Sequence, residues 1–257
     1  MPTGAITGYI DVAQLVLYAF WIFFAGLIYY LHQENKREGY PLESDRSPYI
    51  TVQGYPAIPG PKTYLLPHGG SVTVENGRPD TREIKAVPAF KFLGSPLEPT
   101  GDPMVDGVGP AAYAERADKP DLTFEGEPKI VPLRVAPEWY VEHKDPDPRG
   151  MPVLAADGQI GGTVRDVWVD KSEYIIRYLE VDLPGGDRGS VLLPFTCCRI
   201  DTWQQAVKVV SILADQFARV PRLRNPEQVT LLEEDKIMAY YAGGYLYATP
   251  ERSEPLV

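Results

Sequence analysis

The chain has 257 residues, which is enough for one domain of ordinary size and a smaller second part, and excludes a large multidomain enzyme. Its 25 Lys and Arg against 35 Asp and Glu give a formal net charge of −10. Since nucleic-acid binding depends on clustered Lys and Arg, this acidity argues against nucleic acid as the main partner. With 23 Gly and 26 Pro, much of the chain is expected to be extended or to form turns.

A long apolar run lies near the N-terminus. Residues 12–31 read VAQLVLYAFWIFFAGLIYYL and carry no formal charge. At 1.5 Å per residue they make roughly 30 Å of helix, the thickness of a bilayer's hydrocarbon core. A cleaved signal peptide is the alternative, but no Lys or Arg precedes the run and it is longer than a usual signal core. We therefore predict a retained single-pass transmembrane helix over residues 12–32.

Charges flanking this helix predict its orientation. Lys36 and Arg37 follow it directly, whereas residues 1–11 carry only Asp11. Because positively charged flanks stay on the cytoplasmic side, we expect the bulk of the chain in the cytoplasm. Tyr30, Lys36 and Arg37 lie where anionic lipid headgroups between subunits would be held, and plain interfacial anchoring is the alternative.

Residues 33–137 hold 16 of the 26 prolines, which makes long helices improbable there. A disordered linker is one interpretation of such a composition. A solvated linker would not need the interleaved apolar and aromatic residues, however, which include Tyr64, Leu65, Val72, Phe90 and Phe92. We therefore predict an extended segment that becomes ordered on a partner's surface.

From about Met151 the pattern changes to short runs of β-branched and aromatic residues bounded by turns. Asp157-Gly158 and Pro184-Gly185-Gly186-Asp187 are among these turns. The spacing predicts a small antiparallel barrel or sandwich within a β domain over residues 138–257. The strands are expected at residues 152–155, 163–169, 174–181 and 190–193, and around 206–212.

A short C-terminal helix follows. Thr230-Leu231-Leu232-Glu233 has the form of a capping box, and Asn225-Pro226 offers a rival start one turn earlier. Either helix is expected to run to about Ala242 and to stop at Gly243-Gly244.

Motifs for catalysis and metal binding are missing. The sequence has no G-x-S-x-G, H-E-x-x-H or Walker A pattern, and His32, His68 and His143 show no ligand spacing. Cys197 and Cys198 are adjacent, and two buried or half-buried thiols are a better interpretation than a strained disulfide. We therefore assign no catalytic residue and no metal ligand.

One cluster of charged residues is more informative. Carboxylates near a buried site acquire raised pKa values and pass protons near neutral pH, whereas an exposed acidic hairpin makes only weak ion pairs. Spacing alone does not decide between these interpretations. The cluster surrounds one turn and comprises Asp166, Asp170, Glu173, Arg177, Glu180 and Asp182.

Several blocks closely resemble the H subunit of the purple-bacterial photosynthetic reaction centre, and the strand region resembles the PRC-barrel family. The likeness spans nearly the whole chain. Its blocks are FWIFFAGLIYYL (20–31), REGYPLE (37–43), LLPHGG (65–70), GDPMVDGVGPA (101–111), DVWVD (166–170) and VTLLEEDKIMAYYAGGYLYA (229–248).

This resemblance implies a non-catalytic subunit of a photochemical electron-transfer complex in the bacterial inner, intracytoplasmic photosynthetic membrane, with residues 1–11 in the periplasm. The helix is expected beside the L and M subunits, and the cytoplasmic domain over them. Bacteriochlorophylls, bacteriopheophytins, quinones and non-haem iron are expected in L and M, with none ligated by this chain. Membrane lipids, and also a cytochrome subunit and a light-harvesting complex, are further partners that the family suggests, whereas nucleic acid is not expected.

The resemblance also implies roles for individual residues. Glu173 matches a glutamate beside the secondary quinone pocket, and Asp170 and Arg177 match its polar neighbours on a proton-conducting network. The chain would therefore help deliver the protons that accompany quinone reduction. Upstream the chain departs from the family, because Glu125 and Glu127 stand where members carry a pair of histidines at the proton entrance. Carboxylates hold protons less readily than imidazole at pH 7 and attract zinc or copper less, so we expect a weaker metal site there.

Two other functions compete with this one. A membrane-tethered PRC-barrel adaptor, similar to ribosome-maturation factors, would bind protein or RNA without a pigment partner. A membrane-anchored hydrolase would use Asp170 and Glu173, but it lacks a nucleophile constellation.

Overall fold

The computed structural model describes residues 4–7, 10–44, 47–74, 80–92, 94–185 and 189–253. The chain divides into two compact units. One comprises Met1–Thr81 with Lys91–Ser95, and the other comprises Arg82–Phe90 with Pro96–Val257. The predicted boundary at residue 137 does not coincide with this division, since residues 96–137 belong to the second unit. Residues 1–3, 8 and 9 of the predicted N-terminal segment lie outside the described residues. So do residues 186 and 187 of the predicted Pro184–Asp187 turn.

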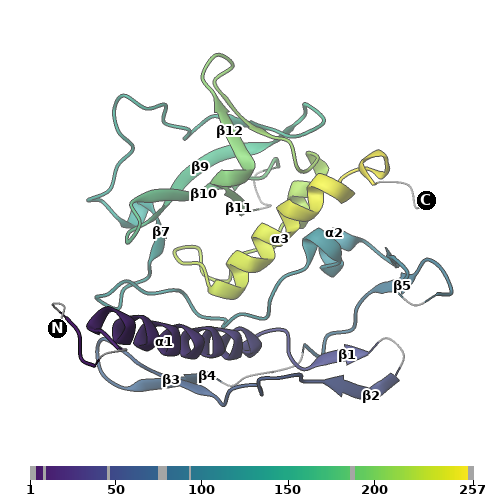
Figure 1. Cartoon of the computed structure of the whole chain (residues 1–257). Coiled ribbons are helices and arrows are strands. Elements are labelled where there is room, and N and C mark those ends of the chain that lie inside the picture. The colour runs from purple at the N-terminus through teal and green to yellow at the C-terminus, as the bar shows by residue number, and fades with distance from the viewer. Residues whose placement is uncertain are drawn as a thin grey trace. The chain divides into compact units, whose positions relative to one another are not determined.

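The first unit is built on helix α1 (Val12–Glu34), drawn in purple in Figure 1. Asp11 caps it, because its carboxylate accepts a 2.7 Å hydrogen bond from the backbone N–H of Gln14. None of its side chains is buried, and its length and apolar composition are sufficient to cross a membrane. The helix thus begins at the predicted residue and ends two residues beyond the predicted 32.

Short two-stranded ladders follow in the proline-rich segment. In the first unit β1 (Leu42–Ser44) pairs with β2 (Ser47–Val52), and β3 (Lys62–Leu65) pairs with β4 (Ser71–Val74). In the second unit β5 (Ala86–Pro88) pairs with β6 (Leu97–Pro99). In the described part of residues 38–137 the longest helix is α2 (Pro103–Asp106), which agrees with the expected scarcity of helix.

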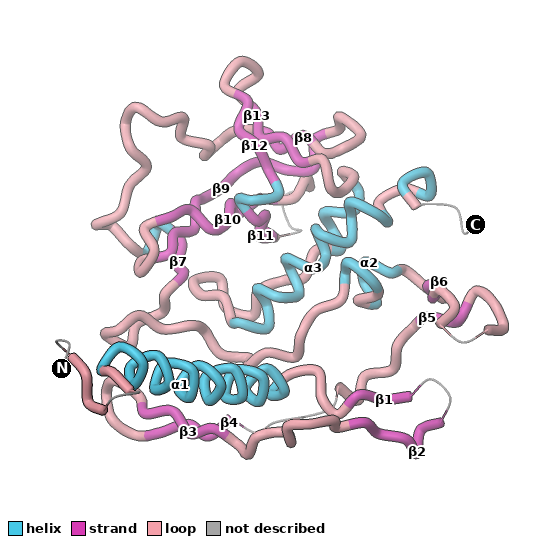
Figure 2. Tube along the Cα trace, in the orientation of Figure 1, coloured by secondary structure: helices cyan, strands magenta, loops and turns pink. Residues whose placement is uncertain are grey.

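The second unit contains one sheet of seven strands, magenta in Figure 2. Its order is β11-β10-β9-β8-β13-β12, with β7 paired to β9. Every expected strand is present, while β7 and β12 were not predicted. The bounds are β7 (Ile130–Pro132), β8 (Pro152–Leu154), β9 (Ile160–Asp170), β10 (Ile175–Asp182), β11 (Ser190–Pro194), β12 (Cys198–Asp201) and β13 (Ala206–Val209).

The predicted class is confirmed as one apolar N-terminal helix, a mainly β domain and a short C-terminal helix. The sheet is not a closed barrel, however. Among the described strands β11 and β12 are its two ends, and β8 pairs with β13 in parallel where an antiparallel barrel was expected. The end strands β11 and β12 are joined by a 3-10 turn at Phe195–Cys197 and are not paired with each other.

Helix α3 (Leu231–Tyr247) runs alongside the sheet in Figure 1 and buries Ile237, Tyr240 and Tyr241 in the core. Its capping box forms as predicted. The Thr230 hydroxyl accepts a 3.1 Å bond from the Glu233 N–H, and the Glu233 carboxylate accepts a 2.9 Å bond from the Thr230 N–H. The helix therefore begins here rather than at Asn225.

The predicted helix end at Gly243-Gly244 is wrong, because α3 continues to Tyr247. The two glycines instead allow close packing. A Cβ on Gly243 would lie 2.6 Å from the Cβ of Ala111, and one on Gly244 would lie 2.5 Å from the carbonyl oxygen of Ser211. Their absent side chains let α3 approach two other segments of the same unit.

Candidate proton-transfer site

One ammonium group, that of Lys129, gathers three carboxylates around the turn between β9 and β10. Its Nζ lies 3.2 Å from Glu173, 3.5 Å from Asp170 and 3.7 Å from Asp121. The pairing of Ile130 with Asp170, which joins β7 to β9, brings Lys129 to the turn. We call these four residues the Lys129 cluster. The sequence predicted Asp170 and Glu173 and missed Lys129. The apolar Ile-Val pair that follows Lys129 was the available signal, because it begins the strand β7.

Asp170 is the buried member of the Lys129 cluster, with 0% of its surface exposed. Its Oδ1 accepts hydrogen bonds from the backbone N–H groups of Ser172 (2.9 Å) and Glu173 (3.0 Å), which hold the turn. Its Oδ2 has no hydrogen-bond partner. This oxygen faces the Lys129 ammonium group at 3.5 Å without a hydrogen bond, so it has room to accept one from a water molecule or to take up a proton.

Glu173 and Asp121 are the accessible acids, with 53% and 49% of their side chains exposed. Burial by itself would lower the pKa of Lys129, but the hydrogen bond from Lys129 to Glu173 and the charges of Asp170, Glu173 and Asp121 raise it. Lys129 therefore stays protonated at neutral pH and compensates part of the acidic charge. The cluster thus joins a buried oxygen, a fixed cation and a solvent-facing carboxylate.

The segment leading to Lys129 carries the two predicted entrance residues. Glu125 and Glu127 are both exposed on a tight loop. The Thr123 N–H donates to the carbonyl of Glu127 at 2.8 Å, and the Lys129 N–H donates to the carbonyl of Asp121 at 2.9 Å. The loop therefore ends at Lys129, whose side chain carries the ammonium group of the cluster.

Arg177 belongs to a different group. Ile176 pairs with Val169 and Tyr178 with Trp168, so Arg177 is the extra residue of a β-bulge, which redirects its side chain. Its guanidinium lies 3.6 Å from Glu234 on α3. Among the described residues Arg177 forms an ion pair with Glu234 and none with Asp170 or Glu173.

Glu234, in the first turn of α3, was not among the predicted site residues. It is buried, and its carboxylate accepts a 2.9 Å hydrogen bond from the Tyr178 hydroxyl. Burial raises its pKa, and the Tyr178 bond and Arg177 oppose the change only partly. It lines a cavity of about 220 Å³ together with Arg116, Arg177 and Asp235.

Two of the remaining predicted acids, Asp166 and Glu180, form a fully hydrogen-bonded group, whereas Asp182 is exposed and lies 3.7 Å from Arg165. Asp166 on β9 and Glu180 on β10 are directly opposite and both are buried, and Arg134 pairs with both. Trp168 (3.1 Å) and Ser190 (2.8 Å) also donate hydrogen bonds to Glu180. Burial alone would raise the pKa of Glu180, but these bonds and Arg134 lower it. We call Arg134, Asp166 and Glu180 the Arg134 cluster.

Lys36, predicted to contact lipid, directs its ammonium group into the protein. It is 4% exposed, and its Nζ donates to the carbonyl oxygens of Gln53 (2.7 Å) and Pro56 (2.6 Å). The same Nζ lies 5.0 Å from the centre of the Tyr40 ring. These contacts fix the chain after α1.

The other two residues predicted at the interface lie nearer the surface. Arg37 is half-buried, forms two hydrogen bonds with Glu34 (2.8 and 2.9 Å) and donates to the carbonyl of Gly60 at 2.7 Å. Tyr30 is 49% exposed. Lipid contact by Tyr30 and Arg37 stays a prediction.

Both cysteines are free, Cys197 buried and Cys198 half-buried, as expected. Burial raises the pKa of both thiols, that of Cys198 to about 12, so neither is an activated nucleophile. Among the described residues no group of three or more His, Cys, Asp or Glu side chains is placed to hold a metal ion.

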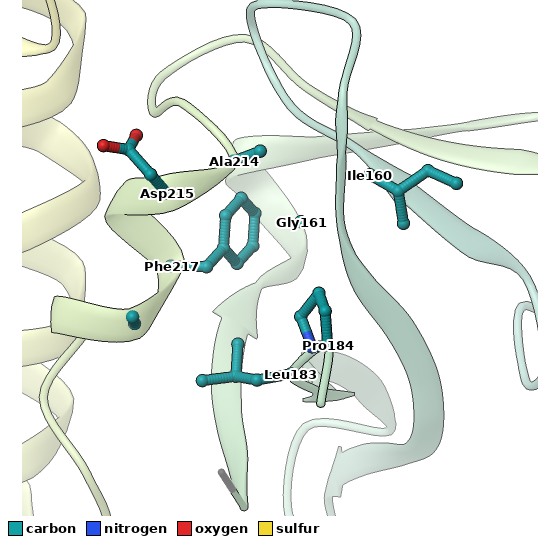
Figure 3. A pocket seen from close by; sticks show the side chains of 8 residues that line it. Ile160, Gly161, Leu183, Pro184, Ala214, Asp215 and Phe217 are labelled. Carbon is teal, nitrogen blue, oxygen red and sulfur yellow. The ribbon is translucent and has the colours of Figure 1, made fainter. Parts of the chain in front are cut away.

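A cavity of about 230 Å³ at the start of β9 is shown in Figure 3. The Phe217 ring fills the space beside Gly161, where a Cβ would lie 2.6 Å from the ring. Asp215 is the only carboxylate among its lining residues, and Figure 3 shows its oxygens pointing away from Phe217. The cavity therefore offers no converging polar groups for chemistry.

Two family models match the chain. The photosynthetic reaction centre H-chain N-terminal region matches residues 4–135, which is just over half of the chain, and the PRC-barrel domain matches residues 141–216. The chain belongs to the reaction centre H-chain family. The resemblance seen in the sequence is thus confirmed. As an H chain it is a subunit of a photosynthetic reaction centre, in a family that is generally non-catalytic, and it associates with the other subunits. Membership together with α1 indicates a membrane-anchored protein.

Proposed function

We propose that this H chain covers the cytoplasmic side of the L and M subunits, supports their assembly and delivers protons to the secondary quinone. The helix α1 supports the assembly role, since its apolar side chains are unburied within the chain and are available to lipid or to neighbouring helices. Residues 33–137, few of them helical, would become ordered against L and M. On this proposal residues 1–11 are periplasmic and the membrane is the intracytoplasmic photosynthetic membrane.

The observation that carries the proton-delivery proposal is the geometry of the Lys129 cluster. Glu173 faces solvent, the Oδ2 of the buried Asp170 makes no hydrogen bond, and the Lys129 ammonium group lies 3.5 Å from this Oδ2 and 3.2 Å from Glu173. Glu173 takes a proton from water, and Asp170 receives it on Oδ2. Lys129 lowers the cost of keeping two carboxylates together between transfers.

Glu125 and Glu127 form the entrance in this proposal, since their loop leads to Lys129. Exposed carboxylates at these positions gather protons from the bulk and exchange them quickly, although they hold them less tightly than imidazole at neutral pH. Arg177 contributes through Glu234, whose raised pKa gives a second buried carboxyl group that exchanges protons closer to neutral pH.

The pigments, quinones and non-haem iron belong to L and M in this proposal, and this chain ligates none of them. A cytochrome subunit and a light-harvesting complex are further partners within the same proposal. Capture of the chain from native membranes by a C-terminal tag tests the assembly role. Reversibly bleaching bacteriochlorophyll and bacteriopheophytin bands in the near infrared are expected. A colourless, intact preparation would contradict the proposal and favour the adaptor function.

Kinetics of quinone reduction test the proton-delivery role. In assembled reaction centres, Glu173→Gln should slow the second, proton-coupled electron transfer and leave the first unchanged. Asp182→Asn is the matched control, because this half-exposed carboxylate on the same hairpin pairs with Arg165 and not with Lys129. An equal rate in the wild type and Glu173→Gln would show that protons bypass this residue.

A further inference from the structure

The turn that carries Glu173 ends on a strained residue. Tyr174 has a φ of 59°, in the left-handed region that bulky side chains rarely adopt. The Oδ1 of Asp170 accepts hydrogen bonds from the N–H groups of Ser172 and Glu173, and its carbonyl accepts one from Tyr174 at 2.9 Å. The next strand starts directly afterwards, where Ile175 pairs with Asp170. Tyr174 therefore closes a tight turn between two paired strands.

A second turn of the same unit, between β12 and β13, is built in the same way. Asp201 accepts 3.0 Å hydrogen bonds from the N–H groups two and three residues further on, and Gln205 then has a φ of 47°. Tyr174 and Gln205 are the two residues other than glycine with a positive φ among the described residues. The Gln205 side chain stabilises its own turn, because its Nε2 donates to the carbonyl of Thr202 at 2.7 Å. The second turn is thus closed by contacts of its own residues.

The turn of Tyr174 is supported by another segment instead. The Trp139 ring lies against the Tyr174 ring, with 4.8 Å between their centres and 43° between their planes. Trp139 is held in place, because it packs against the core and its backbone N–H donates to the carbonyl of Ala136 at 2.9 Å. An aromatic pair contributes a free energy of the same order as the cost of a left-handed residue other than glycine. The contact with Trp139 therefore offsets the strain at Tyr174.

The strained residue directly follows Glu173 of the Lys129 cluster. The Glu173 carboxylate lies 3.2 Å from the Lys129 ammonium group, and its side chain is 53% exposed, so packing does little to hold it there. Its backbone is held by the hydrogen bond to Asp170 within the turn. An unsupported tyrosine would leave the left-handed region and open this turn. The place of the carboxylate therefore depends on the conformation of Tyr174.

We propose that Trp139 and Tyr174 are positioning residues of the Lys129 cluster, whose ring contact keeps Tyr174 in the left-handed conformation and so keeps the Glu173 carboxylate beside Lys129. Neither ring exchanges a proton in this account. A glycine in place of Tyr174 would adopt the same conformation without strain, but it would leave the turn freer to open. The effect on proton transfer rests on the proposed function, whereas the effect on the turn depends on the geometry alone.

Amide hydrogen exchange of the turn, measured on the full chain in mild detergent, tests the geometry. Tyr174→Ala removes the ring and keeps the strain, so the turn should exchange roughly tenfold faster than in the wild type, whereas Tyr174→Phe should match the wild type. Tyr174→Gly removes the ring and the strain together and should exchange more slowly than Tyr174→Ala. If the tyrosine only filled space, glycine would be the worse of the two, and that order would overturn the proposal.

The role of Trp139 has its own test in the same measurement. Trp139→Leu should speed exchange of the turn as Tyr174→Ala does, because Tyr174 then stays strained without support. Adding Tyr174→Gly to Trp139→Leu should reverse most of this increase, since the strain is gone. Absence of any reversal would overturn the role of Trp139.

Kinetics in assembled reaction centres test the effect on proton transfer. Tyr174→Ala should lower the rate of the second, proton-coupled electron transfer about tenfold, because a misplaced proton donor transfers more slowly, and Tyr174→Gly should restore part of the rate. Gln205→Ala is the matched control, since it removes the support of the second turn and should leave the rate unchanged. In the Glu173→Gln background Tyr174→Ala should have no further effect.

The outcomes separate this inference from the proposed function. A slow Glu173→Gln together with a wild-type rate in Tyr174→Ala would overturn the positioning role and leave the function standing. A wild-type rate in Glu173→Gln would contradict the function, and the exchange order of Tyr174→Ala and Tyr174→Gly would then decide whether the rings hold the turn. A further loss of rate from Tyr174→Ala in the Glu173→Gln background would show that Tyr174 acts on another group and would overturn the proposal.

Discussion

The two groups of acids on β9 and β10 share the same strands and differ in how completely their charges are satisfied. In the Arg134 cluster both carboxylate oxygens of Glu180 accept hydrogen bonds, and the pKa of this buried carboxyl is lowered. In the Lys129 cluster Asp170 is also buried, yet its Oδ2 makes no hydrogen bond and only faces the Lys129 ammonium group at 3.5 Å, and its neighbour Glu173 faces solvent. A carboxylate with all its bonds made stabilises the fold, whereas one with an open position is suited to exchange protons.

Removing the cation of the Arg134 cluster should have the largest effect. Arg134→Met leaves Asp166 and Glu180 buried and opposite each other with only the longer Arg165 pair, 3.7 Å from Glu180, as compensation, which should cost roughly 3 kcal/mol of unfolding free energy. Urea unfolding of the full chain in mild detergent measures it. Arg149→Met is the matched control, since Arg149 pairs with the exposed Asp147. Equal stability of the two variants would show that the Arg134 cluster is not structural.

Exchanging one acid from each group separates stability from proton transfer. Glu180→Gln weakens charged hydrogen bonds and should cost about 1–3 kcal/mol of stability while leaving the proton-coupled rate unchanged. Glu173→Gln should leave stability nearly unchanged and lower this rate by about 10²-fold, the low end of acid–base contributions. Flash kinetics and urea unfolding on the same two variants supply both numbers. A similar pattern in both variants would remove the distinction between the clusters.

The pH dependence of stability should have opposite signs at Glu180 and Glu234. Because the pKa of Glu180 is lowered from 4.5, its contribution is present above about pH 4.5 and is lost as the pH falls through the folded-state pKa. Because the pKa of Glu234 is raised, the folded state holds its proton more tightly, and stability falls as the pH rises from 4.5 through the raised pKa.

Unfolding of Glu234→Gln from about pH 2 to about pH 8 checks the second sign. The variant should lack the decline in stability on the alkaline side of pH 4.5 and should keep the loss at acid pH that Glu180 causes. An unchanged profile would mean that Glu234 titrates normally in the folded chain.

The smallest effect is expected at the entrance. Wild-type reaction centres should be inhibited by Zn²⁺ only weakly through Glu125 and Glu127, whereas Glu125→His/Glu127→His should be inhibited at lower Zn²⁺ concentrations, because imidazole is the better ligand. Proton-coupled electron transfer during a zinc titration measures the difference. Comparable inhibition that Glu125→Gln/Glu127→Gln abolishes would show that the carboxylates bind zinc well.

The sequence was a good guide where structure depends on neighbours along the chain. Thr230 and Glu233 are three residues apart, and their capping box formed as predicted. Gly243 and Gly244 were misjudged, because the spacing cannot reveal that Ala111 and Ser211 lie against them. A glycine that ends a helix and one that allows close packing have the same local signature.

The candidate site shows the same division. Asp170 and Glu173 flank one turn and were found together, whereas Lys129 reaches them only through the pairing of β7 with β9, some forty residues away in sequence. Arg177 was grouped with them, and a single bulge sends its side chain to Glu234 instead. Pairing register and bulges depend on contacts across the sheet, so spacing does not report them.

The central claim is that the Lys129 cluster carries protons toward the secondary quinone. Flash-induced proton uptake, followed with a pH-indicator dye in assembled reaction centres, tests it most directly when Asp170→Asn/Glu173→Gln is compared with Asp182→Asn. Our account predicts that uptake coupled to the second electron slows in the double variant and keeps the wild-type rate in Asp182→Asn. Wild-type uptake in the double variant, with the complex intact, would contradict it.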